Sequence, residues 1–166
     1  MMLYHGGLST VQTPRIIRGE RIGDFGVGFY TTTDLEQARR FVLRKCAVAG
    51  ADHGVISMYS IPDDLLAGDK LSVKRFTGPD DDWVQFVFAN RRVATYEHGF
   101  DLVFGPVAND QVYASLALFE DGQIGTEELV RRLKTRRLVD QLLFHTERSL
   151  EFLDYIGSME VLCKER

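Results

Sequence analysis

The sequence is poor in the residues that mark metal-binding, disulfide-rich and multidomain proteins. Its 166 residues include two cysteines, Cys46 and Cys163, and neither stands in a Cys-x-x-Cys or Cys/His spacing. We therefore expect no metal site and two reduced thiols, although the sequence leaves a single disulfide open. With four prolines, no repeat and no low-complexity linker, the chain is expected to form one domain over residues 1–166.

Long apolar runs and an excess of positive charge are also absent. No apolar run approaches the length that spans a bilayer, and the first residues carry no signal-peptide pattern. The net charge is −4, so no global positive field attracts nucleic acid or an anionic membrane. We expect a cytoplasmic protein without a membrane partner, with export by a route that needs no signal left open. The basic segment 131–137 is interpreted as a solvated helix end.

The composition that remains is that of an ordinary globular protein, with 45% apolar and 27% charged residues. Runs of β-branched and apolar residues predict strands at 2–5, 29–32, 55–61, 71–76, 100–104 and 142–144. Apolar residues at helical spacing predict helices at 34–49, 83–90 and 110–119, with a strand as the alternative for 83–90. Pro14 and a closing Gly19 favour a further short helix at 14–18. Because strands and helices do not alternate steadily, the pattern favours an α+β fold over a doubly wound sheet.

Several helix ends carry capping signals. Thr33 and Glu36 form a capping-box pattern before the helix at 34–49, and Thr126 is expected to cap another helix. Asn109 and the residue after it are interpreted as an N-cap rather than as substrate contacts. A last helix is expected to cover Leu150 and Leu153.

Two glycine-containing motifs near the N-terminus carry the strongest functional signal. They read Leu3-Tyr4-His5-Gly6 and Asp24-Phe25-Gly26-Val27-Gly28-Phe29-Tyr30-Thr31-Thr32. The second motif is not a Rossmann fingerprint, because it lacks the third glycine and precedes a strand, and it is not a Walker A loop. Alone, a histidine at a strand end or a Gly-x-Gly turn is usually structural. Together they form one way to hold a flat heterocycle and a sugar.

In this order the two motifs resemble the ADP-ribosyltransferase superfamily, on the PARP and diphtheria-toxin side that uses a His-Tyr-acid triad. The resemblance also includes Ile16-Ile17-Arg18-Gly19 and Gln37-Ala38, and it covers about the first quarter of the chain. Segments 96–105, 105–110 and 141–146 resemble a small bacterial family of uncharacterised ADP-ribosyltransferase-like proteins. The resemblance implies two packed antiparallel sheets with surrounding helices and NAD in the cleft between them.

The resemblance also implies how NAD is held. His5 would bind the adenine-side ribose, Tyr30 the nicotinamide and Gln141 the reacting ribose, so these are the expected catalytic residues. The expected cofactor-binding residues are His5, Gly6, Gly26, Gly28, Tyr30 and Thr31. The chemistry is consistent, because an imidazole can hydrogen-bond a hydroxyl, a glycine backbone can be approached closely, and a phenol ring can stack on a flat cationic ring.

The third triad position departs from the pattern. Relatives have a glutamate there, whose carboxylate binds the ribose 2′-hydroxyl and stabilises an oxocarbenium-like transition state, whereas this chain has Gln141. Glutamine can hold the hydroxyl but brings no negative charge, and losing such stabilisation costs about two to three orders of magnitude in rate. Glu147, Glu97 or Asp110 are alternative sources of the charge.

The activity that the resemblance implies is mono-ADP-ribosyl transfer, in which NAD is cleaved at the nicotinamide–ribose bond and ADP-ribose passes to a macromolecular acceptor. Small bacterial proteins of this type often act as toxins, with a cognate antitoxin or immunity protein as partner. Two alternatives stay open: a catalytically silent module that binds NAD or ADP-ribose, and an NAD glycohydrolase with water as acceptor. A 2′-phosphotransferase shares the fold, but no arginine-rich pocket pattern supports it.

Overall fold

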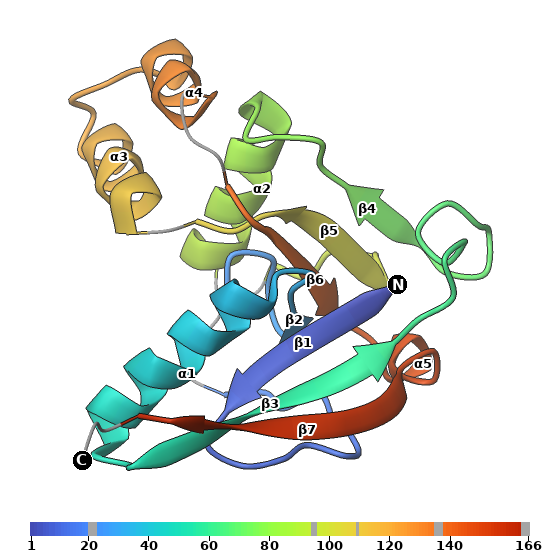
Figure 1. Cartoon of the computed structure of the whole chain (residues 1–166). Coiled ribbons are helices and arrows are strands. Elements are labelled where there is room, and N and C mark those ends of the chain that lie inside the picture. Colours follow the sequence, from blue (N-terminus) through green and yellow to red (C-terminus); the bar gives the residue numbers. More distant parts are fainter. Residues whose placement is uncertain (20–22, 94–95, 109, 135–137, 164–166) are drawn as a thin grey trace.

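A computed structural model of the chain describes residues 1–19, 23–93, 96–108, 110–134 and 138–163. Strands and helices are interspersed along these ranges, and the fold is α+β, as predicted (Figure 1). The strands are β1 (Met2–Gly7), β2 (Phe29–Thr31), β3 (His53–Ser60), β4 (Val73–Arg75), β5 (Leu102–Pro106), β6 (Asp140–Phe144) and β7 (Asp154–Leu162). The helices are α1 (Leu35–Ala49), α2 (Asp81–Arg92), α3 (Asp110–Glu120), α4 (Thr126–Lys134) and α5 (Glu147–Leu150).

The strands of the described ranges form two sheets. One is antiparallel with the order β1-β3-β7, and the other has the order β2-β6-β5-β4. In the second sheet β4 runs parallel to β5, while the other neighbours are antiparallel. The expectation of two purely antiparallel sheets is therefore wrong at β4. The reason is that α2 carries the chain from β4 back to the start of β5, and such a crossover makes neighbouring strands parallel.

The two sheets are joined where β1 passes the end of β2. Tyr4 and Thr32 exchange backbone hydrogen bonds, and both N–O distances are 2.9 Å. This bridge brings His5 of β1 beside Tyr30 of β2, although 25 residues separate them. The bridge therefore positions the two predicted ligand-binding motifs side by side.

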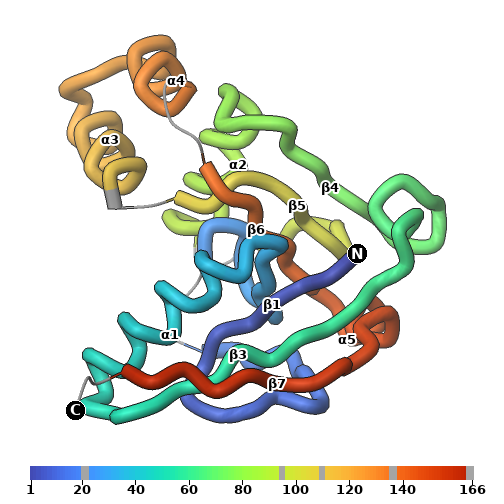
Figure 2. Tube along the Cα trace, viewed as in Figure 1, coloured from blue at the N-terminus to red at the C-terminus, as the bar shows by residue number. Residues whose placement is uncertain are grey.

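Alternating side chains along the strands divide the core into layers. Between the sheets, Leu3 and Tyr59 of the first sheet pack with Phe29, Leu142 and Phe144 of the second. α1 covers the other face of the first sheet, and α2 lies against the other face of the second, while α3 and α4 pack together on the side of α2 (Figures 1 and 2). One buried cluster joins these helices to the second sheet, and it includes Trp83, Val87, Val112, Leu116 and Leu129 together with Phe25, Val103 and Leu143.

Most predicted elements are confirmed, with shifts at their ends. The helices at 34–49, 83–90 and 110–119 correspond to α1, α2 and α3, and the alternative strand at 83–90 is wrong. The cap of α1 differs from the prediction, because Asp34 rather than Thr33 is the N-cap and its Oδ1 accepts a hydrogen bond from the Gln37 amide at 2.8 Å. Thr126 is the first residue of α4. Asn109 and residues 135–137 lie outside the described ranges.

Two predictions about elements are wrong. Residues 14–18 form no helix. The last predicted helix ends at Leu150, and Leu153 lies beyond it, directly before β7. The sequence did not indicate β7, because most of its side chains are exposed or partly exposed and its apolar residues do not alternate cleanly. Pairing with β3 over its length fixes β7 as a strand.

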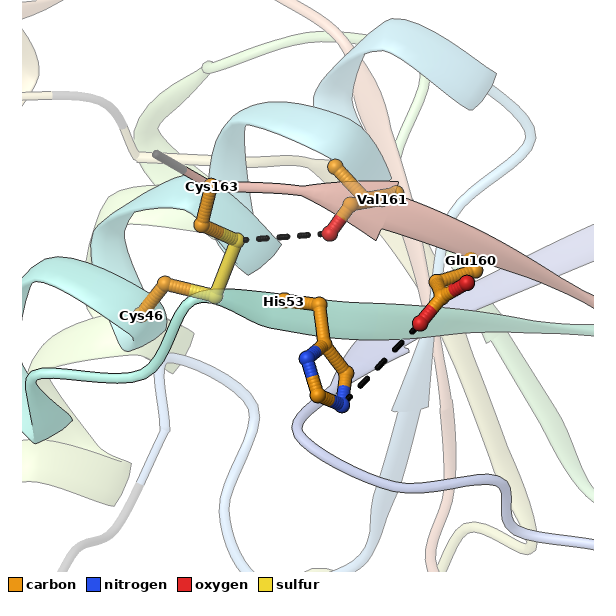
Figure 3. Close-up of a disulfide and its surroundings, with 5 residues drawn as sticks. All are labelled: Cys46, His53, Glu160, Val161 and Cys163. Carbon is orange, nitrogen blue, oxygen red and sulfur yellow. Dashed lines mark hydrogen bonds and ion pairs between the residues drawn. A yellow bond between two sulfur atoms is a disulfide. The ribbon is translucent and has the colours of Figure 1, made fainter. Parts of the chain in front are cut away.

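The two cysteines form a disulfide. Cys46 lies in the last turn of α1 and Cys163 directly follows β7, with their Cα atoms 6.1 Å apart (Figure 3). The expectation of two reduced thiols is therefore wrong in this structure. The bond attaches the end of α1 to the sheet that it covers. None of the helices in the described ranges is long and apolar enough to cross a membrane.

Candidate functional site

A cleft with a volume of about 730 Å³ contains every residue that the sequence predicts to hold a ligand. β1 contributes His5 and Gly6, the segment that leads into β2 contributes Gly26 and Gly28, and β2 contributes Tyr30. Thr31 and Gln141 also line it. The volume lies in the range of about 300–1,000 Å³ that is usual for small-molecule sites.

His5 is held as a neutral imidazole. Its Nδ1 lies 2.7 Å from the carbonyl oxygen of Tyr30. Because a carbonyl only accepts, Nδ1 carries the proton, which leaves Nε2 as a hydrogen-bond acceptor. The ring stacks on Phe29 with centroids 4.4 Å apart. Burial lowers the pKa of His5 more strongly than the hydrogen bond to Tyr30 raises it, so the ring is uncharged at pH 7. The side chain can therefore accept a hydrogen bond from a ligand hydroxyl.

Tyr30 uses its hydroxyl to close its own loop. The hydroxyl donates to the Gly26 carbonyl at 2.6 Å and accepts from the Phe25 amide at 3.1 Å. Burial raises the pKa of Tyr30 well above its usual value, so the phenol stays protonated. The ring, rather than the hydroxyl, is thus available to a ligand.

The glycines of the second motif are required by the turn that carries Tyr30. The Gly26 amide donates to the Gly23 carbonyl at 3.0 Å. Gly26 has a φ of 98°, a backbone conformation that residues with a side chain rarely adopt. A Cβ on Gly26 would also lie 2.7 Å from Oδ1 of Asn90, and one on Gly28 would overlap the backbone of Phe144. These glycines therefore have packing reasons that are independent of any ligand.

Gly6 and Thr31 also make structural contacts. A Cβ on Gly6 would lie 2.7 Å from the carbonyl oxygen of Ala38, so the glycine lets α1 approach β1 closely. The Thr31 hydroxyl donates to the Leu142 carbonyl at 3.1 Å and ties β2 to β6. Their predicted contacts with a ligand remain predictions.

Gln141 is buried near the start of β6. Its Nε2 donates to the carbonyl oxygen of Pro106 at 3.4 Å, and its backbone pairs with Gly105 of β5. The side chain also lies beside Asp24, where it helps to lower the pKa of that carboxyl. Gln141 therefore lies near a carboxylate in the cleft, although it carries no charge itself.

Asp24 is the buried acid of the cleft, and the sequence assigned it no role. Its side chain is 6% exposed and lines the cleft beside Gln141. Oδ1 accepts from the hydroxyl of Tyr113 at 3.2 Å, and Oδ2 accepts from the amide of Ala108 at 3.4 Å. Burial raises the pKa of Asp24 more than the nearby Arg91 and the hydrogen bonds lower it. Its place at the start of the glycine motif was the one signal in the sequence.

The three acids that the sequence offered as alternatives do not contribute a described side chain to the cleft. Glu97 is exposed and pairs with Arg18 at 2.8 Å. Glu147 is exposed in the first turn of α5. Asp110 begins α3, and its side chain lies outside the described part of the structure. Among described side chains, Asp24 is the aspartate or glutamate that lines the cleft.

Basic side chains also line the cleft, and the sequence did not single them out. Arg44 and Lys45 come from α1, and Arg15 comes from the segment after β1. The Lys45 ammonium lies 4.9 Å from the ring centroid of Phe41. Burial lowers the pKa of Lys45. These cations can neutralise an anionic part of a ligand. Within the described ranges, no group of three or more His, Cys, Asp or Glu side chains could hold a metal ion.

The sequence matches a known protein family. Residues 1–155 match the family described as Protein of unknown function (DUF3990). The chain belongs to this DUF3990 family. No curated protein and no solved structure matches the chain. The DUF3990 match includes every cleft residue named above, from His5 to Gln141.

The DUF3990 cleft combines groups that suit a ligand with several chemical parts. It offers an uncharged acceptor on His5, an aromatic ring on Tyr30, a buried acid with an amide, and cations on α1. A dinucleotide could match these groups, because its hydroxyls can hydrogen-bond to His5 or the amide, its rings can stack on Tyr30 and its pyrophosphate can pair with the cations. The cleft therefore gives the functional hypothesis a specific location in the molecule.

Proposed function

We propose that this protein is a mono-ADP-ribosyltransferase that binds NAD in the cleft and transfers ADP-ribose to a macromolecule. The observation that carries the proposal is the meeting of His5, Tyr30 and Gln141, from three different strands, at one cleft. The resemblance of the sequence motifs to ADP-ribosyltransferases also supports the proposal, because it depends on residue order and not on the geometry of the cleft.

Each group has a role in this proposal. Nε2 of His5 accepts a hydrogen bond from a hydroxyl of the adenine-side ribose. The Tyr30 ring stacks on the nicotinamide, and the Gln141 amide holds a hydroxyl of the reacting ribose. Arg44 and Lys45 neutralise the pyrophosphate. Such charge-assisted contacts are stronger than neutral hydrogen bonds, so the cations would set much of the affinity.

The test is incubation of the purified protein with NAD labelled in its adenylate half, together with a bacterial lysate. The wild type should release nicotinamide and label a macromolecule. His5→Gln should reduce nicotinamide release by about tenfold or more, because it disturbs the ribose contact. His53→Gln is the matched control, since His53 is an exposed histidine on β3 that does not line the cleft. Absence of nicotinamide release from the wild type would contradict the enzyme proposal.

Gln141 favours one further candidate, a catalytically silent module that binds NAD or ADP-ribose. The residue has no charge to offer a developing cation. Calorimetry that shows NAD binding without nicotinamide release would support the silent module. Release of free ADP-ribose without a labelled macromolecule would instead identify an NAD glycohydrolase, with water as the acceptor.

A toxin role and a cytoplasmic location belong to the same proposal. Induced expression in a bacterial host should slow growth for the wild type and not for His5→Gln, and co-expression of a cognate antitoxin or immunity protein should restore growth. The disulfide weighs against the cytoplasm, because structural disulfides are rare there. Alkylation of free thiols in intact cells tests the location: labelling of Cys46 and Cys163 is the cytoplasmic result.

A further inference from the structure

Asp24 is a buried acid in the cleft to which neither the sequence motifs nor the family match gives a role. Four separate segments meet at its carboxylate: its own turn, Ala108 after β5, Tyr113 of α3 and Gln141 of β6. The turn is fixed by the backbone bond between Gly23 and Gly26, and it directs Phe25 into the core while Asp24 lines the cleft. The carboxylate is therefore held in a defined position.

We propose that Asp24 is a catalytic residue that supplies the negative charge missing at Gln141. This inference rests on the proposed function. In the transfer step the bond between C1′ of the ribose and the nicotinamide nitrogen breaks, and its electron pair leaves with neutral nicotinamide. The acceptor forms a bond to C1′ and loses its proton to solvent. Positive charge develops on the ribose while the first bond breaks, and a nearby carboxylate stabilises it.

The position of Asp24 relative to Gln141 supports this assignment. The Gln141 amide lies beside the carboxylate in the same cleft, so a ribose hydroxyl held by Gln141 lies close to the acid. Hydrogen bonds from Tyr113 and Ala108 aim the carboxylate, and fixed donors of this kind cost no reorganisation during the reaction. Amide and acid then divide between two side chains the tasks that one glutamate performs in the resembled enzymes.

Burial makes Asp24 an expensive group to keep. Attraction from the cation Arg91 and interactions with Tyr113, Ala108 and Gln141 lower the pKa of Asp24, but they do not return it to the ordinary range. Arg91 lies over the ring of Tyr113, with its guanidinium carbon 4.8 Å from the ring centroid. A cationic part of a ligand would add to the attraction that Arg91 already provides.

The first test compares Asp24→Asn with Asp64→Asn, whose acid is exposed and outside the cleft. Asp24→Asn should lower kcat for nicotinamide release by about 100-fold or more, as loss of one transition-state contact commonly does, while KM for NAD rises by about tenfold at most. Asp64→Asn should match the wild type. Adding Gln141→Glu to Asp24→Asn should raise kcat by about tenfold or more relative to Asp24→Asn alone, because it returns a carboxylate to the site.

A second variant does not depend on the folding of Asp24→Asn. Gln141→Glu in the wild type places a second carboxylate beside Asp24, and repulsion between the two acids should lower kcat by about threefold or more. An increase of about 100-fold would show that the charge is missing, and would overturn the proposal.

A binding measurement gives a readout apart from turnover. The wild type should bind NAD⁺ more tightly than NADH in calorimetry, because the oxidised nicotinamide is cationic, and Asp24→Asn should reduce that preference by about tenfold. Equal kcat and equal preference in a folded Asp24→Asn protein would overturn the role of Asp24 while the proposed function stands. A wild type that neither binds nor cleaves NAD would overturn the proposed function, and the role of Asp24 with it.

Discussion

The cleft has a basic side and an acidic side, and different kinds of structure form them. α1 contributes Arg44 and Lys45 from one regular helix, whereas the turn before β2 and the strand β6 contribute Asp24 and Gln141. Partners of the acid are far away in sequence, since Ala108 is 84 residues from it. The difference suggests a direction for the proposed ligand, with the pyrophosphate toward α1 and the cationic nicotinamide toward the acid.

The largest expected loss of stability comes from removing the disulfide, which attaches α1 to the sheet that it covers. Replacing Cys46 and Cys163 by serine removes a cross-link between residues 117 apart. We expect the free energy of unfolding to fall by about 2–5 kcal/mol, as measured by urea denaturation. The same wild-type protein under reducing conditions is the control and should show the same loss. An unchanged midpoint of urea denaturation would mean that the cross-link does not stabilise the attachment of α1.

A smaller effect should distinguish the basic side of the cleft from the acidic side, because the basic side is expected to change NAD binding and the acidic side kcat. Arg44→Ala with Lys45→Ala should raise the dissociation constant of NAD by about tenfold or more, because two cations near the pyrophosphate are lost. The kcat should stay within about threefold of the wild type, in contrast to the result expected for Asp24→Asn. Arg39→Ala is the control, since Arg39 is exposed on α1 and does not line the cleft. If the double variant binds NAD as tightly as the wild type, the proposed binding of the pyrophosphate at α1 is wrong.

The smallest expected effect is the pH dependence of stability at Asp24. Its folded-state pKa is raised above the ordinary value of 3.8, so the folded protein holds this proton more tightly than the unfolded chain. The wild type therefore loses stability at this site as the pH rises above 3.8 through the folded-state pKa. We expect Asp24→Asn to gain about 2–4 °C in Tm relative to the wild type between pH 4 and pH 8. A relative loss over this range would indicate that the charged acid serves mainly as a structural anchor.

The local parts of the fold could be predicted, and the assembled parts could not. α1 was predictable because Ala38, Val42 and Cys46 repeat at helical spacing. β7 was not, because its strand character comes from pairing with β3 rather than from its own pattern. The missing helix at 14–18 shows the same limit, since a proline and a later glycine permit a helix without requiring one.

The candidate site divides in the same way. His5 and Tyr30 were predictable because they belong to motifs with a recognisable order, and the bridge between Tyr4 and Thr32 brings them together. Asp24 was not, because its importance depends on burial against Ala108 and Tyr113. A single acid in a glycine-rich turn is usually exposed, and only tertiary packing changes its pKa.

A crystal structure of the protein with NAD tests the central proposal most directly. We predict the nicotinamide ring on Tyr30, the hydroxyls of its ribose within hydrogen-bond distance of Gln141 and Asp24, and the pyrophosphate beside Arg44 and Lys45. An adenine ring against Asp24, or NAD bound outside the cleft, would contradict the proposed site.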